Sequence, residues 1–82
     1  MKYREIVKDL NGAEVKASDI NRNGLFKNFE KGMFGTLRNE SWSFYADVEC
    51  VSKRGNTYTF RSTTYGHKFI VNFDDDTVIC QG

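Results

Sequence analysis

A chain of 82 residues is enough for one small domain, and its composition, 39% apolar and 28% charged, is that of an ordinary globular protein. The net charge of +1 argues against a surface directed strongly at polyanions, and no apolar run approaches the roughly 20 residues that a membrane helix needs. The start of the chain, MKYREIV, has no apolar signal segment. We therefore expect a single domain over residues 1–82, located in the cytoplasm and not at a membrane.

The first ten residues carry four apolar side chains at the spacing of one helical face. These are Tyr3, Ile6, Val7 and Leu10. The Asn11-Gly12 pair that follows is a typical end of a helix. The alternative is a β-hairpin that turns at Asn11-Gly12, but a two-residue loop would set Asp9 opposite Glu14, two like charges. We therefore favour a helix.

The next segments give weaker patterns. Residues 13–20 fit a strand and a helix equally well. A short helix is predicted between Gly24 and Gly32, because Leu25, Phe26, Phe29 and Met33 fit one helical face. The stretch MFGTLRN that follows fits either a loop or a brief strand.

The second half of the chain alternates apolar and polar side chains with a period of two, which predicts strands. The first strand places Trp42, Phe44, Ala46, Val48 and Cys50 on one apolar face. Further strands are predicted over residues 57–65, over residues 68–73 and after Asp76. A three-residue loop at residues 54–56 and two-residue turns at Gly66-His67 and Asp75-Asp76 join them.

These three turns fix a register that can be checked. The register pairs Cys50 with Phe60, Glu49 with Arg61, Thr64 with Phe69, Phe60 with Phe73, Phe73 with Val78 and Val71 with Cys80. All three turns place the apolar side chains on the same face of the sheet. The fold class predicted from the sequence is therefore α+β, with one or two short N-terminal helices packed on a four-stranded antiparallel β-meander.

Candidates for chemistry are few. His67, the single histidine, is the obvious candidate for acid-base chemistry, but the tip of a tight hairpin offers no pocket and no orienting partner. Cys50 and Cys80 lie about 14 Å apart in the predicted register, too far for a disulfide. The run 74–76 of three aspartates lacks the other ligands of a calcium loop. We expect no catalytic residues, no metal site and no cofactor, and hence no enzyme.

The outward face of the predicted sheet is too apolar for a purely solvated surface. Either the N-terminal helices cover part of it, or the sheet curls, or this face binds a partner. The candidate partner-binding residues are Tyr45, Arg61, Tyr65, Lys68 and Ile70. We expect a small non-enzymatic binding protein, a regulator or inhibitor of the kind that phages and other mobile elements encode, which occupies the surface of a macromolecular protein partner.

The alternative function is that of a nucleic-acid-binding accessory protein. Residues 53–68 hold four basic side chains and no acidic one, namely Lys53, Arg54, Arg61 and Lys68. Tyr45 and Tyr65 would then serve as stacking rings for bases. The acidic residues on both sides of this segment count against nucleic acid as the partner. The sequence defines neither the partner nor the oligomeric state.

Overall fold

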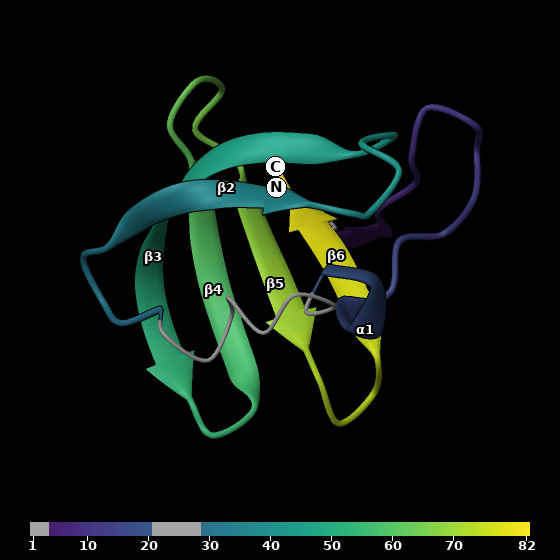
Figure 1. Cartoon of the computed structure of the whole chain (residues 1–82). Coiled ribbons are helices and arrows are strands. Elements are labelled where there is room, and N and C mark those ends of the chain that lie inside the picture. The colour runs from purple at the N-terminus through teal and green to yellow at the C-terminus, as the bar shows by residue number, and fades with distance from the viewer. Residues whose placement is uncertain (1–3, 21–28) are drawn as a thin grey trace.

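The computed structural model describes residues 4–20 and 29–82, which form one antiparallel sheet and a single short helix (Figure 1). The elements are β1 (Arg4–Ile6), α1 (Ala17–Ile20), β2 (Phe34–Arg38), β3 (Tyr45–Arg54), β4 (Thr57–Ser62), β5 (Lys68–Asn72) and β6 (Thr77–Gln81). The six strands lie in the order β1-β6-β5-β4-β3-β2. No helix among the described residues has the length and apolar character needed to cross a membrane.

The sheet curls into an open barrel. Figure 1 shows β2 and the first half of β3 crossing over one end of the other strands. At that end the segment after β1 meets the β2–β3 turn, where the amide of Leu10 donates to the carbonyl oxygen of Ser43 (2.8 Å). The hydroxyl of Ser43 in turn donates to Oδ2 of Asp9 (2.9 Å). We call this end, where residues 8–14, the β2–β3 turn and the β4–β5 loop lie, the mouth of the barrel.

The core lies on the concave side of the curled sheet. Its buried apolar residues are Val7, Val15, Ala17, Ile20, Leu37, Phe44, Val48, Cys50, Tyr58, Phe60, Phe69, Val71 and Val78. Phe60 is fully buried and contacts the rings of Phe29 (centroids 5.4 Å apart) and Tyr58 (6.0 Å). The segment of α1 covers this concave side, so the described helix does not cover the outward face.

The prediction of an α+β domain with a four-stranded sheet is wrong, because the protein is mostly β and its described helix has four residues. The helix predicted over the first ten residues is replaced by β1, which pairs with β6. Residues 1–3 of that prediction lie outside the described part. A β-bridge then joins Lys8 to Glu14, so the hairpin that the sequence analysis rejected is the structure that forms.

This hairpin avoids the expected charge repulsion because its loop has three residues instead of two. Asp9 faces Ala13, whose carbonyl oxygen accepts from the Asp9 amide (2.9 Å), and the like charges of Asp9 and Glu14 are no longer opposed. Gly12 supplies the left-handed backbone (φ 82°) that such a loop requires. The Asp9 carboxylate accepts from the amides of Asn11 (2.8 Å) and Ala13 (3.0 Å), which holds the turn.

The second predicted helix also fails where it can be checked. Its residues 25–28 lie outside the described part, and residues 29–33 form a turn in which the Met33 amide donates to the carbonyl of Glu30 (3.0 Å). The following stretch forms β2, one of the two alternatives considered. Gly35 in this strand lies so close to the ring of Phe29 that a Cβ atom there would come within 2.3 Å of it.

Four consecutive antiparallel strands do form from residue 45 to 81, as predicted, and the pairs Cys50–Phe60 and Glu49–Arg61 are confirmed. The β3–β4 loop has two residues, since Arg54 pairs with Thr57. A β-bulge at residue 51 absorbs the difference between this loop and the predicted one.

The other predicted pairs are wrong. The observed partner lies two or more residues from the predicted one along the strand, because the β4–β5 and β5–β6 loops are longer than predicted. Phe60 faces Phe69, Phe69 faces Cys80, and Val71 faces Val78. Polar caps favour the longer loops. The Tyr65 amide donates to Oγ of Ser62, and Oδ1 of Asn72 accepts two amides of the β5–β6 loop. An even shift leaves each side chain on its predicted face.

Candidate functional site

The structure divides the predicted partner-binding residues into two groups. Tyr45 and Tyr65 lie at the mouth of the barrel and are 63% and 80% exposed. Arg61, Lys68 and Ile70 lie on the outward face instead, where Lys68 pairs with Arg61 and not with Tyr65. The Arg61 guanidinium donates to a carboxylate oxygen of Glu49 (2.7 Å).

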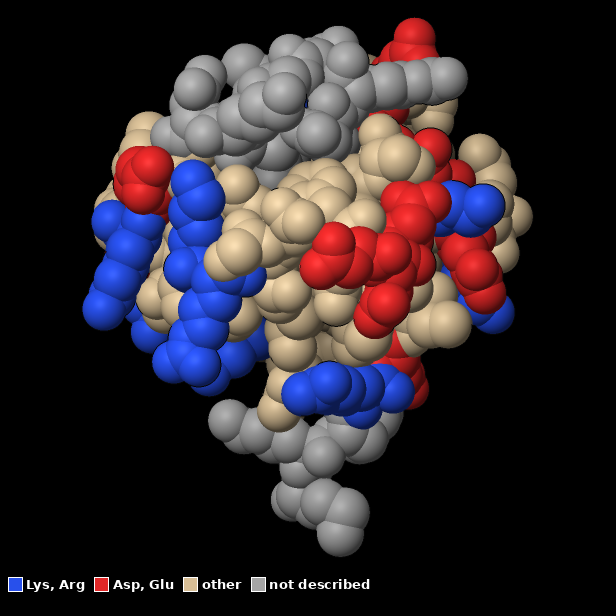
Figure 2. All heavy atoms as spheres, turned by 90° about the horizontal axis from the view of Figure 1, so that it is seen from below, with Lys and Arg blue, Asp and Glu red and all other residues tan. Residues whose placement is uncertain are grey.

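The basic residues proposed for nucleic-acid binding are also divided. Arg61 and Lys68 share the outward face. Lys53 and Arg54 lie at the end of β3, and Arg54 is four residues, or about 13 Å, from Arg61 as measured along the paired strand β4. Figure 2 views the molecule from that end and shows basic side chains mainly on the side of the β3–β4 turn and acidic ones mainly on the side of the β5–β6 turn. Within residues 4–20 and 29–82, no continuous basic track joins the four residues.

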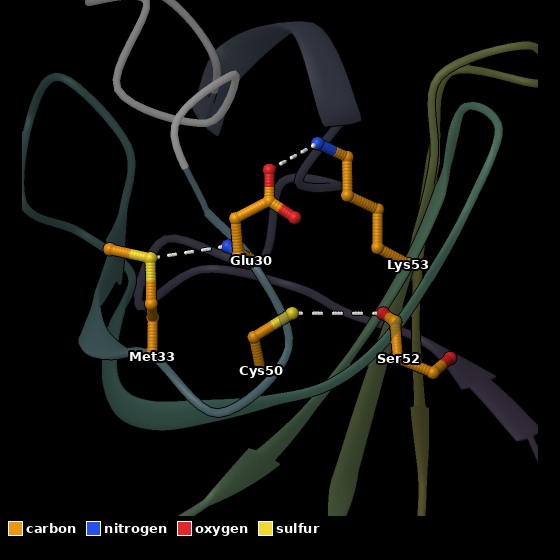
Figure 3. A network of polar contacts seen from close by, with 5 residues as sticks. All are labelled: Glu30, Met33, Cys50, Ser52 and Lys53. Carbon is orange, nitrogen blue, oxygen red and sulfur yellow. Dashed lines mark hydrogen bonds and ion pairs between the residues drawn. The ribbon is translucent and has the colours of Figure 1, made fainter.

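The bulge at residue 51 explains the position of Lys53. Beyond it the alternation of β3 is reversed, so Lys53 lies on the same side as Tyr58, with its ammonium 5.4 Å from the ring centroid. The ammonium also pairs with Glu30 (3.4 Å), as Figure 3 shows. A lysine held by a ring and a carboxylate has less of its charge available for a phosphate.

The most exposed cluster of rings includes a residue that the sequence analysis placed in the core. Trp42 was assigned to the apolar face of a strand, but the strand begins only at Tyr45, and Trp42 is 55% exposed in the β2–β3 turn. Its ring packs edge-on against Tyr45 (centroids 6.2 Å apart), and the guanidinium of Arg38 lies 4.4 Å from its centroid.

The backbone of Trp42 is left-handed, with φ of 59°, a conformation that bulky side chains rarely adopt. Its strain is on the order of 1 to 3 kcal/mol. The turn is held by Asn39, whose side chain accepts from the Phe44 amide (3.1 Å) and donates to Oγ of Ser43 (2.8 Å). The Trp42 amide itself donates to the carbonyl of Asn39 (3.2 Å). The surrounding polar contacts therefore impose this conformation on an exposed tryptophan.

Tyr45 and Tyr65 line the same open hollow of about 400 Å³. Its other lining residues include Asp47, Ser62, His67 and Phe69. The ring of His67 stacks on Tyr65 (centroids 5.8 Å apart, 11° between planes) and meets Phe69 edge-on (4.8 Å). His67 is thus half-buried beside two aromatic rings and does not form the tip of a two-residue turn.

We call Trp42, Tyr45, Tyr65 and His67 the aromatic rim. Among them the sequence analysis identified the two tyrosines as site residues. The contribution of Trp42 could be suspected only from its place in the polar stretch NESWS.

Both cysteines are free thiols that lie at the two ends of one row across four strands, with Phe60 and Phe69 between them. The Cys50 thiol is buried, donates to the carbonyl of Ser52 (3.7 Å), and has a raised pKa because of its burial (Figure 3). Burial also raises the pKa of Cys80, and the neighbouring Glu5 adds to this shift. Raised pKa values disfavour the reactive thiolate, so these side chains serve packing.

Comparisons of the chain with models of protein families, with curated proteins and with solved structures find no match. Only the geometry of the chain itself therefore bears on its function.

Proposed function

We propose that the protein is a small non-enzymatic binding protein, a regulator or inhibitor, that docks on a protein partner through the aromatic rim. The observation that carries this proposal is Trp42, a large ring that is held exposed in a strained conformation by the hydrogen bonds of its turn. Strained residues cluster at functional sites, and tryptophan, tyrosine and arginine are the side chains enriched in binding hot spots.

The arrangement of the rim favours protein over nucleic acid as the partner. The rings of Trp42 and Tyr45 are in contact, and the hollow beside Tyr45 has a buried apolar floor at Phe69. A protein side chain can fill such a hollow, which is within the size range of ligand sites. Asp47 lines this hollow, and its carboxylate would repel a phosphate there.

The experiment is affinity capture from a lysate of the cells that encode the protein, comparing the native chain with Trp42→Gly combined with Tyr45→Ser. Loss of two hot-spot rings is expected to cost at least about 2 kcal/mol, or roughly 30-fold in affinity. Phe34→Ser is the matched control, because Phe34 is an aromatic residue 68% exposed in β2, outside the rim.

The proposal is supported by a partner that the control retains and the double variant loses. It is contradicted if every captured protein binds the double variant as well as it binds the native chain while both remain folded.

A further inference from the structure

A second hollow, of about 810 Å³, adjoins the aromatic one at the mouth of the barrel. Phe69 lines both hollows, and its ring contacts Phe44 (centroids 5.8 Å apart), which lines the second. The two hollows therefore share Phe69 as a lining residue, and Phe44 packs against it in the second. We call the two hollows together the mouth groove.

The far end of this groove is acidic. Glu5 and Glu14 line it together with one basic residue, Lys8. The place of Glu5 is unusual, because it pairs with Cys80 in a row that continues through Phe69 and Phe60 along the concave side of the sheet. A carboxylate at the end of an otherwise apolar row contributes nothing to the core, but it is well placed to meet a ligand in the groove.

The described residues that line the groove carry a net negative charge. Three of them bring a carboxylate, namely Glu5, Glu14 and Asp47, and one brings an ammonium, Lys8. The aromatic hollow adds ring faces, and such faces attract cations, most strongly where water is partly excluded. Charge complementarity therefore points to a basic occupant, and the aliphatic stems of its lysine or arginine side chains supply the apolar part that covers Phe44 and Phe69.

We propose that the mouth groove receives an extended basic segment of the protein partner, with one lysine or arginine side chain in the aromatic hollow and another facing Glu5 and Glu14. This inference rests on the proposed function and names the chemistry of the partner. In an extended segment alternate side chains on one face are about 6.8 Å apart. Three lysines at alternate positions thus span about 13.6 Å, and the two hollows have Phe69 as a common lining residue.

The test uses two capped pentapeptides, Lys-Val-Lys-Val-Lys and Gln-Val-Gln-Val-Gln, titrated into the full chain. The fluorescence of Trp42, the single tryptophan of the sequence, reports binding at the rim. The lysine peptide is expected to bind at least about ten-fold more tightly than the glutamine peptide at low salt, and this preference should shrink as salt screens the charges.

The variant Glu5→Gln combined with Asp47→Asn should remove most of this preference, again about ten-fold. Asn at position 47 keeps an oxygen that can accept from the Thr36 hydroxyl, as Asp47 does (2.8 Å). Asp74→Asn combined with Asp75→Asn is the control, because it also removes two negative charges, both in the β5–β6 turn. If the double variant does not fold, Glu5→Gln alone serves, since Glu5 is exposed.

Equal binding of the two peptides, or no binding of either, overturns the inference and leaves the proposed function to be decided by capture with the Trp42 variant. A single-stranded oligothymidine that binds the rim more tightly than the lysine peptide also overturns it. Self-association in sedimentation that is lost in the Trp42 variant would assign the groove to a second copy and would exclude the basic partner segment.

Discussion

At the scale of single residues, Trp42 shows how an exposed site escapes a pattern based on alternation. The period of two runs from Trp42 into β3, and it placed this ring in the core beside Phe44. The turn conformation depends instead on side-chain hydrogen bonds from Asn39 and Ser43 and on the left-handed backbone at position 42. Alternation carries no information about such contacts, so the central residue of the candidate site could not be predicted from it.

Trp42→Gly should therefore leave the free energy of unfolding within about 1 kcal/mol of the native value, because glycine adopts a φ of 59° without strain. Removal of the strain at position 42 stabilises the variant. The lost contact with Arg38 and the greater freedom of the unfolded chain offset part of this stabilisation. Urea unfolding measures the change, and Phe60→Ala, with an expected loss of about 3 to 5 kcal/mol, is the comparison. A similar loss for Trp42→Gly would mean that the tryptophan is a core residue.

Gly35→Ala should destabilise the protein by about 1 to 3 kcal/mol, the usual cost of overpacking. The added methyl group would lie 2.3 Å from the Phe29 ring, which in turn packs on Phe60. Phe29→Leu shortens the opposing side chain. In a double-mutant cycle, the double variant should therefore lose less stability than the sum of the losses of the two single variants. Strict additivity would show that the ring does not lie against Gly35.

At the scale of elements, the hydrophobic pattern determined the face of each strand, whereas the caps of the loops determined the register. The β4–β5 and β5–β6 loops are longer than predicted by an even number of residues, so Phe60, Phe69 and Val71 still point into the core. The N-terminal prediction failed for a related reason: Ile6 and Val7 fit a helix locally, but pairing of β1 with β6 outweighs that preference.

The register is open to a direct test by nuclear magnetic resonance. Cross-strand backbone contacts should connect Phe60 with Phe69, Phe69 with Cys80, and Val71 with Val78, because these residues are paired in the structure. Contacts between Thr64 and Phe69 would instead indicate a two-residue turn at Gly66-His67. That result would move Tyr65 beside Lys68 and dismantle the aromatic hollow.

The link between α1 and the sheet should depend on pH. The Asp76 carboxylate accepts from the amide of Ser18 (2.8 Å), and this bond lowers the pKa of Asp76 below its ordinary value of 3.8. A lowered native pKa adds stability above pH 3.8, and this contribution is lost as the pH falls through the native pKa.

The urea midpoint should accordingly fall more steeply below pH 3.8 in the native chain than in Asp76→Asn. Asparagine is the matched variant, because it keeps an acceptor for Ser18 and tolerates the left-handed backbone at this position (φ 55°). Identical acid profiles for the two chains would show that Asp76 does not support the helix.

At the scale of the whole molecule, the two ends of the barrel differ in character. The mouth carries exposed rings around a groove with a net negative lining, while the opposite end carries separate basic and acidic turns (Figure 2). The curl of the sheet creates the mouth by bringing residues 9–10 to the β2–β3 turn. No short-range pattern predicts contacts between segments 34 residues apart, and for that reason the sequence analysis found two members of the rim but not the groove.

The closure of the barrel should depend on Ser43, a largely buried serine whose hydroxyl donates to Asp9 and accepts from the side chain of Asn39. Ser43→Ala removes a partner from both groups and should cost about 1 to 3 kcal/mol of stability.

Hydrogen exchange at the Leu10 amide, which donates to the Ser43 carbonyl, should accelerate more than exchange in the central strand β5, because the mouth opens locally before the sheet unfolds. Thr64→Ala is the control, because Thr64 carries an exposed hydroxyl in the β4–β5 loop at the mouth and is not bonded to Ser43. An equal acceleration at Leu10 and throughout β5 would mean that Ser43 stabilises the whole fold and does not specifically close the mouth.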